Sequence, residues 1–97
     1  MDAKLIFIYI EEETVKFWPN PSTGKLSLAF NLNESSVLKV SVYPAASSHS
    51  EKIVLTDSWR PAGKFEETYN LNHLRKGIYL IQIQTESQVV TKRLIVN

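Results

Sequence analysis

The 97-residue sequence contains no cysteine, and this absence excludes disulfide bridges, thiolate nucleophiles and sulfur-ligated metal sites. Neither sign of charge dominates, because eleven Lys and Arg oppose ten Asp and Glu, for a formal net charge of +1. A chain with this balance lacks the positive surface on which nucleic-acid binding depends. The longest apolar run, Leu5–Ile10, is far shorter than the roughly 20 residues that a membrane-spanning helix needs.

A secretory signal peptide at the N-terminus is not predicted. Lys4 precedes the apolar run, but Asp2 lies where positive charge is required, and Glu11–Glu13 follow where small residues should form a cleavage site. If the protein is exported, its address therefore lies elsewhere. Hydrophobic residues (43%) and charged residues (22%) occur in the proportions of a folded chain, and the length suits one domain.

The sequence also lacks any long window with a helical period, and alternation of apolar and polar residues takes its place. The strands predicted in this way are Leu5–Ile10, Thr14–Phe17, Leu26–Leu32, Leu38–Tyr43, Ile53–Leu55, Phe65–Tyr69, Ile78–Thr85 and Val89–Val96. Glu11–Glu13 are predicted to separate the first two as a solvated acidic turn. Seven or eight short strands with frequent turn signals predict an all-β fold, an immunoglobulin-like antiparallel β-sandwich.

One face of each alternating strand is predicted to line a core between the two sheets. Because the side-chain period of a strand is two, these apolar residues point to the same side. They are Leu26, Leu28, Phe30, Val40, Val42, Tyr79, Ile81, Ile83, Leu94 and Val96. Glu86 and Ser87 lie between the last two alternating runs, so these runs are predicted to form a hairpin.

Glycine and proline mark the loops whose geometry can be predicted. Gly77 lies directly before an apolar strand, where a positive φ is needed that other residues tolerate poorly. Pro19 and Pro21 restrict the loop that leads into the strand from Leu26, and Asn20 between them is predicted to cap this turn with its side chain. The loop is expected either to be a rigid lead-in alone or to contact a partner as well.

Side chains that could carry catalysis or bind a metal ion are few. His49 and His73 have no third ligand at a recognisable spacing, so no metal site is predicted. Ser22 and the serines at positions 47, 48 and 50 lie outside a Gly-x-Ser-x-Gly motif, and no set of acid, base and nucleophile accompanies them. The sequence therefore predicts a protein that is not an enzyme and has no cofactor.

Four aromatic residues offer either packing surface or a platform for carbohydrate: Trp18, Tyr43, Trp59 and Tyr79. The alternation places Tyr79 in the core. Tyr43 falls on the opposite face of its strand and is predicted to be exposed, and Trp59 is predicted to lie in a loop. Packing of loops onto sheet edges is the favoured interpretation, with carbohydrate binding as the alternative.

Four segments of the sequence are distinctive and occur in a fixed order. They are Trp18–Leu26 with Pro-Asn-Pro and a later Gly, Val40–Tyr43, Leu71–Tyr79, and the basic and apolar Val90–Asn97. In this order and with these gaps they resemble the C-terminal sorting domain of type IX secretion cargo in Bacteroidota. Each segment alone is common, but the ordered set covers residues 17–97.

The resemblance implies a fold, a function and a location. Members of this family are non-catalytic β-sandwich domains that follow a cargo protein in the chain and are recognised by the outer-membrane export machinery. A surface sortase then removes the domain. The resemblance thus implies a sorting domain at residues 17–97 and passage through the periplasm to the cell surface or the medium. Residues 1–16 are interpreted as an N-terminal extension, whose candidate strands Leu5–Ile10 and Thr14–Phe17 leave open whether it adds one strand, two strands or none to the sandwich.

The resemblance also implies recognition residues, which belong to its motifs: Pro19, Asn20, Pro21, Gly24, Gly77, Tyr79, Lys92, Arg93 and Leu94. Lys92 and Arg93 interrupt the apolar alternation of the last strand, where they either protect a sheet edge from aggregation or face the export machinery, or do both. The alternative function is a small standalone Ig-like binding or adhesion module at the bacterial surface. Neither interpretation involves a nucleic acid.

Two features depart from the family pattern. The segment Pro44–Lys52 is longer than the tight Asp-x-x-Gly-Lys turn of the family and contains no Gly, so a looser hairpin is predicted there. Only sixteen residues precede Phe17, too few for a cargo protein. On this interpretation the sequence is a fragment of a longer protein or an orphan reading frame.

Overall fold

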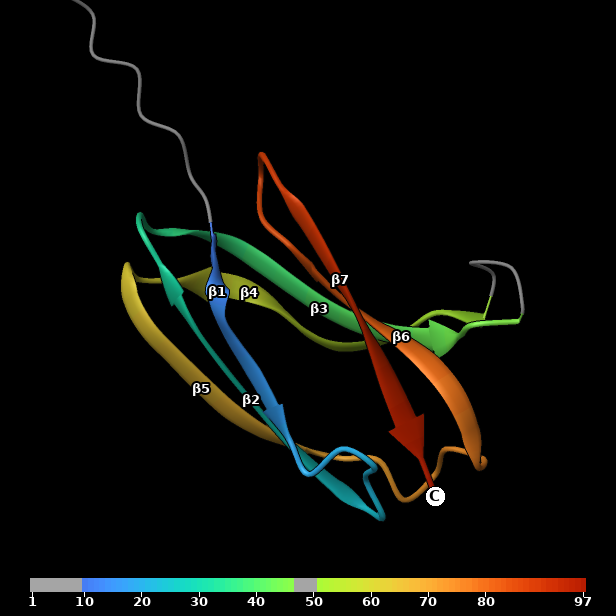
Figure 1. Ribbon diagram of the computed structural model, residues 1–97. Helices are drawn as coiled ribbons and strands as arrows, with labels where there is room; N and C mark the ends of the chain where they lie inside the picture. Colours follow the sequence, from blue (N-terminus) through green and yellow to red (C-terminus); the bar gives the residue numbers. More distant parts are fainter. Residues whose placement is uncertain (1–9, 47–50) are drawn as a thin grey trace, which may run out of the picture.

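The computed structural model describes residues 10–46 and 51–97, which form antiparallel strands in two packed sheets (Figure 1). The strands are β1 (Ile10–Trp18), β2 (Lys25–Leu32), β3 (Ser36–Pro44), β4 (Ile53–Arg60), β5 (Gly63–Asn70), β6 (Gly77–Gln84) and β7 (Val89–Val96). One sheet has the order β1-β2-β5, and the other has the order β4-β3-β6-β7. This arrangement confirms the predicted antiparallel β-sandwich.

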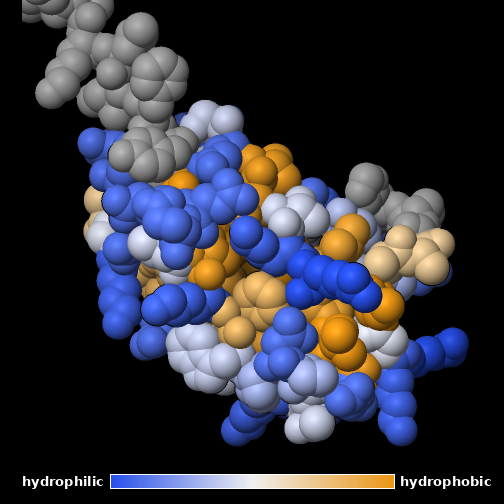
Figure 2. Space-filling view, viewed as in Figure 1, coloured by the Kyte–Doolittle hydropathy of each residue, from blue (hydrophilic) through white to orange (hydrophobic). Residues whose placement is uncertain are grey.

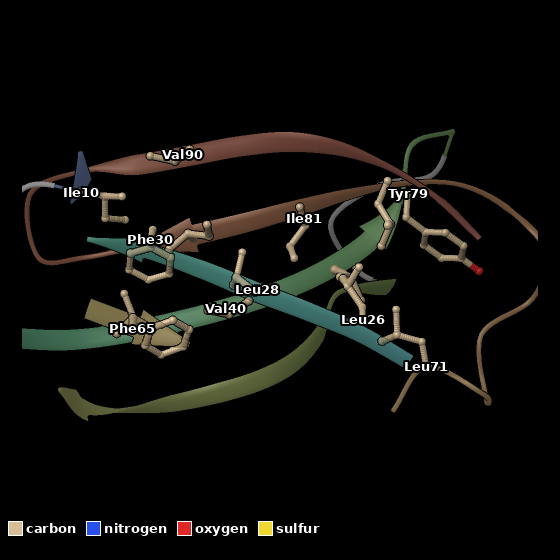
Figure 3. Packing of buried hydrophobic residues seen from close by; sticks show 14 of the residues in the cluster. Ile10, Leu26, Leu28, Phe30, Val40, Phe65, Leu71, Tyr79, Ile81 and Val90 are labelled. Carbon is tan, nitrogen blue, oxygen red and sulfur yellow. The ribbon is translucent and has the colours of Figure 1, made fainter. Parts of the chain in front are cut away.

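The core lies between the two sheets and contains all ten residues predicted to line it, none more than 6% exposed. Alternation explains this outcome, because each strand turns every second side chain toward the opposite sheet. At one end of the core Phe30 stacks on its register partner Phe65, with ring centroids 4.5 Å apart (Figure 3). Burial of each large apolar side chain stabilises the fold by about 1.5–3 kcal/mol before the cost of ordering the chain is counted.

Ion pairs connect the edge strands on both open sides of the sandwich. On the side where β1 lies opposite β7, Lys92 Nζ lies 3.5 Å from Glu12 Oε1. Figure 2 shows hydrophobic surface between these two strands, with hydrophilic side chains around it. On the other side, Arg60 of β4 pairs with Glu67 of β5. Charged side chains on the inner positions of edge strands discourage pairing with another sheet.

The Arg60–Glu67 pair shares its carboxylate with a tyrosine. The Tyr69 hydroxyl donates to Glu67 Oε1 at 3.1 Å. Burial raises the pKa of Tyr69 above its ordinary value, and the neighbouring Glu67 carboxylate raises this pKa further. The folded protein therefore holds Tyr69 neutral at a pH where the unfolded chain ionises it.

The consequence is a loss of stability at alkaline pH. A group whose pKa is raised by folding stabilises the fold fully below its unfolded pKa, about 10 for tyrosine, and this stabilisation is lost as the pH rises further. We expect Tyr69→Phe to have a lower free energy of unfolding than wild type at neutral pH. Above about pH 10 the difference in unfolding free energy between the two proteins should narrow, because only wild type loses stability when the tyrosine of its unfolded chain ionises. Denaturant unfolding of both proteins at the two pH values measures the gap, and a constant gap would contradict this account.

Strand β1 differs from the sequence prediction, because it runs through Glu11–Glu13 instead of breaking there. The register of β1 against β2 shifts between Glu11 and Lys16, so the additional residues form a β-bulge. Within the bulge, Thr14 Oγ1 donates to the Glu11 carbonyl at 2.6 Å and accepts from the Asn31 amide at 2.9 Å. These bonds replace ladder bonds and keep the strand continuous. The predicted strand Leu5–Ile10 lies outside the described residues, apart from its last residue.

Two aromatic residues also differ from their predicted surroundings. Tyr43 is 6% exposed although it faces away from the core. Its strand β3 lies in the interior of the sheet, and the Lys52 ammonium group lies 5.9 Å from the centre of its ring. Trp59 is 61% exposed, but its backbone belongs to β4 and pairs with Val37 rather than lying in a loop. The strands on either side of β3 therefore bury Tyr43, and pairing with β3 places Trp59 in a strand.

The predicted hairpin between the last two strands is confirmed. Strands β6 and β7 pair along their full length, and at the turn the Thr85 amide donates to the Gln88 carbonyl at 2.9 Å. Strands β3 and β4 also pair, with an irregularity between Val40 and Ser41, while residues 47–50 of their connection lie outside the described residues. The described part of the chain contains no helix long and apolar enough to cross a membrane.

Candidate functional site

Most of the predicted recognition residues gather at one end of the sandwich. This end, here called the motif end, consists of loop 19–24 between β1 and β2, loop 71–76 between β5 and β6, and the last residues of β7. Figure 1 shows both loops beside the C-terminus. In the core beneath them, Leu26, Leu71 and Tyr79 lie close together (Figure 3). Segments far apart in the sequence therefore form one continuous surface.

The Pro-Asn-Pro loop, residues 19–22, is bound to the outer edge of β7. The Ser22 amide donates to the Ile95 carbonyl at 2.8 Å, and the Asn97 amide donates to the Ser22 carbonyl at 2.8 Å. Between these bonds, the Ile95 amide donates to Asn20 Oδ1 at 3.0 Å. The Asn20 side chain therefore bonds the edge of β7, whereas the sequence predicted that it caps its own turn.

Ser22 is the buried part of this loop, a role for which its sequence neighbourhood gives no signal. Its side chain is fully buried, and its hydroxyl donates to the Lys25 carbonyl at 3.0 Å. Pro19 and Pro21 are exposed on either side of Asn20, and the peptide bonds that precede the two prolines are cis. The loop thus presents two rigid prolines to solvent while Ser22 fixes it to β7.

Gly24 connects this loop to the other loop of the motif end. Its carbonyl accepts a hydrogen bond from the Leu71 amide at 2.6 Å. A Cβ at position 24 would lie 2.6 Å from Asn72 Oδ1, so only glycine fits without displacing that side chain. The close approach of the two loops is the physical reason for glycine at this position.

Gly77 and Tyr79 hold the start of β6. Gly77 has φ +155°, which confirms the predicted positive value. The Tyr79 hydroxyl donates to the Arg75 carbonyl at 2.7 Å, while its ring is buried in the core. Tyr79 therefore positions loop 71–76 from within the core.

Replacing Gly77 by Val is expected to lower the free energy of unfolding by about 1 kcal/mol or more. No atom lies within 4 Å of the position that a Cβ would take, so the cost arises from backbone strain rather than from a clash. Melting temperatures of Gly77→Val and of Lys76→Val, a control at the exposed neighbouring position, measure the effect. An unchanged melting temperature in Gly77→Val would contradict the explanation.

The basic pair of β7 divides between two environments. Lys92 shares the inward-facing positions of the strand with Val90 and Leu94, and its ammonium group lies beside Glu12 of β1. Arg93 is exposed on the opposite face and forms no ion pair with any described residue. Lys92 therefore fits the edge-protection interpretation, and Arg93 is the cation available to a partner.

The motif end carries positive charge. Residues 19–27 and 68–80 contain Lys25, Arg75 and Lys76 together with His73, and no Asp or Glu. All four side chains are exposed. With Arg93 on the adjoining strand, the exposed side chains of these loops favour contact with an acidic surface.

Other candidate sites from the sequence gain no supporting geometry. Within residues 10–46 and 51–97, no three or more His, Cys, Asp or Glu side chains come close enough to hold a metal ion. His49 and the serines at positions 47, 48 and 50 lie outside the described residues. Trp18 and Trp59 are exposed on strands of different sheets, so they do not form one aromatic platform.

Comparison with known protein families finds a match over most of the chain. A family model described as secretion system C-terminal sorting domain matches residues 16–97. The match covers every strand after β1, the end of β1 and both loops of the motif end. No curated protein matches the chain.

Proposed function

Because the chain belongs to the family of secretion system C-terminal sorting domains, we propose that its motif end and strand β7 are the surface read by the export machinery. Membership makes the chain a non-catalytic domain recognised by a type IX, or Por, secretion system and exported across the outer membrane. The observation that carries the proposal is the bond between Asn20 and Ile95. It joins two family motifs that are 75 positions apart into one exposed surface.

Exposure and charge support this assignment. Pro19, Asn20, Pro21 and Arg93 are exposed and lie within reach of a partner, whereas Leu94 is fully buried and contributes by holding β7 in place. The opposite end of the sandwich contains none of the four family segments except the first residues of Val90–Asn97. A partner that binds the motif end would therefore contact the residues that distinguish the family from other β-sandwiches.

The finer steps of the pathway form part of the same proposal. The domain follows a cargo protein in the native chain, passes through the periplasm and is removed by a sortase, which leaves the cargo at the cell surface or in the medium. Residues 17–97 act as the sorting domain. Residues 1–16 are an extension, part of which lengthens β1.

The test is export of a reporter. The full 97-residue chain is fused behind a signal peptide and a reporter in a bacterium with a type IX system. We expect the reporter at the cell surface or in the medium, and in the periplasm of a mutant host that lacks the system. If the fusion stays in the periplasm while a known sorting domain in the same host is exported, the proposal is wrong. The surface-binding module then becomes the better interpretation.

A further inference from the structure

Alternate residues of β7 turn their backbone groups away from β6. In an antiparallel pair, a residue that exchanges both hydrogen bonds with the neighbouring strand is followed by one whose N–H and C=O point to the other side. The backbone bonds of Ile95 to the Pro-Asn-Pro loop show that Ile95 points outward. By alternation, the backbone groups of Thr91 and Arg93 also face the outer edge of the sheet.

The outer edge of β7 is closed at both ends and open between them. At the start of β7, Gln88 Oε1 accepts a hydrogen bond from the Ile10 amide of β1 at 2.7 Å. At its end, the Pro-Asn-Pro loop occupies the edge beside Ile95. In the described part of the chain, nothing bonds the outward backbone groups of Thr91 and Arg93, and both residues are exposed.

The Pro-Asn-Pro loop already uses this edge as an added strand would. Ser22 forms a parallel bridge with Val96, and both its N–H and its C=O are bonded to β7. A second extended segment on the open positions would continue the line that this loop begins. The edge is therefore a site at which extended chain binds within this molecule.

We propose that an extended segment of a protein of the export machinery adds to β7 as a further strand, through the backbone groups of Thr91 and Arg93. This inference rests on the proposed function. Backbone bonds of this kind supply affinity with little demand on the side chains of the domain. Arg93, with no ion-pair partner among the described residues, selects an acidic side chain on the added strand.

The inward Lys92 disfavours pairing of the same edge with a second copy of the domain. Its ammonium group beside Glu12 places charge at the rim of the core, where a second sheet would have to bury it. A single added strand leaves that rim exposed to water. The edge thus accepts a strand while it resists the joining of two sheets.

Proline substitution tests the backbone contact directly. Thr91→Pro and Arg93→Pro each remove an N–H that faces the open edge and leave the ladder with β6 intact. We expect the full-length variants to keep a melting temperature near that of wild type, while export of the reporter fusion falls by on the order of tenfold.

A matched control lies on the edge of the other sheet. The Leu71 amide, just after β5, points toward β2 and donates to the Gly24 carbonyl. Because successive amides of a strand point to opposite sides, the Glu66 amide of β5 points away from β2, toward the open edge of its sheet. Glu66→Pro therefore makes the same backbone change on an edge that the proposal does not use. Its fusion is expected to be exported as wild type, and loss of export in Glu66→Pro equal to that in the β7 variants would overturn the proposal.

The outcomes separate this inference from the proposed function. If the wild-type fusion is not exported, the proposed function itself is wrong. If wild type is exported and the folded Thr91→Pro and Arg93→Pro variants are exported equally well, only the proposal of an added strand is wrong. If the proline variants do not fold, Arg93→Glu, which keeps the backbone, is expected to lose export severalfold while Arg93→Lys does not, and wild-type export of Arg93→Glu would overturn the proposal.

Discussion

Deletion of residues 92–97 is expected to leave the fused reporter in the periplasm, with export near background. The deletion removes the register partners of β6 from Gly77 to Ile81. It also removes Ile95 and Asn97, to which the Pro-Asn-Pro loop is bonded. Both the proposed recognition strand and the support of the loop are lost. Fractionation of cells that carry the full and the shortened fusion measures the effect, and undiminished export of the shortened fusion would contradict the role of β7.

A milder variant separates loss of recognition from loss of folding. Lys92→Gln with Arg93→Gln keeps the length and the alternation of β7 and removes only charge. The Lys92–Glu12 pair is largely exposed to solvent, so its loss should cost at most about 1 kcal/mol after screening. We expect a folded variant with reduced export. If export is unchanged, the basic pair protects the edge and is not part of the address.

The second large effect is on stability, and it concerns the first strand. A chain that begins at residue 17 is expected to be less stable than the full chain by about 3–5 kcal/mol. Ile10 is 2% exposed and packs at the end of the core near Phe30 and Val90 (Figure 3). Its amide is bonded to Gln88 at 2.7 Å, so the truncation also frees the start of β7.

A point variant isolates the core contribution. Ile10→Ala in the full chain is expected to cost about 2–4 kcal/mol, because the buried methyl groups are lost and a cavity remains. Val37→Ala is the matched control, since Val37 is 47% exposed on β3. Its cost should be less than about 0.5 kcal/mol. Denaturant unfolding measures both, and equal stability of Ile10→Ala and wild type would show that β1 is not part of the folded unit.

Features set by local chemistry could be predicted from the sequence. Alternation identifies the ten core residues because the inward positions of a strand face the other sheet. Gly77 could be predicted because a loop that turns into an apolar strand needs a positive φ. The hairpin between β6 and β7 follows from two alternating runs separated by a short polar turn. Each of these signals lies within a few residues of its consequence.

Features set by distant contacts could not be predicted. The bond from Ile95 to Asn20 joins positions that are 75 apart, so nothing in the neighbourhood of Asn20 indicates it. The sequence of Glu11–Glu13 predicts a turn, and the strand found there depends on the hydrogen bond between Thr14 and the Asn31 amide of β2, across the bulge. Burial of Tyr43 depends on the strands that lie on either side of β3.

The candidate site divides in the same way. Family motifs locate the residues of the site, but only the folded chain shows that Tyr79 and Leu94 are buried supports while Arg93 is exposed. The different directions of Lys92 and Arg93 could be predicted, because Lys92 lies two residues before Leu94 and the alternation of a strand places both side chains on the same, inward face. The role of Gln88 has no signal in the sequence, since its partner lies in β1.

Site-specific photo-crosslinking in cells that export the fusion shows which face of the domain contacts the export machinery. A photoreactive phenylalanine analogue is placed at Pro21 or Arg93 of the proposed surface, or at Val37 or Trp59, which are exposed on β3 and β4. We expect the probes at Pro21 and Arg93 to crosslink to the same outer-membrane protein and those at Val37 and Trp59 not to crosslink to it. Crosslinks to that protein from Val37 and Trp59, with none from Pro21 and Arg93, would contradict the proposed recognition surface.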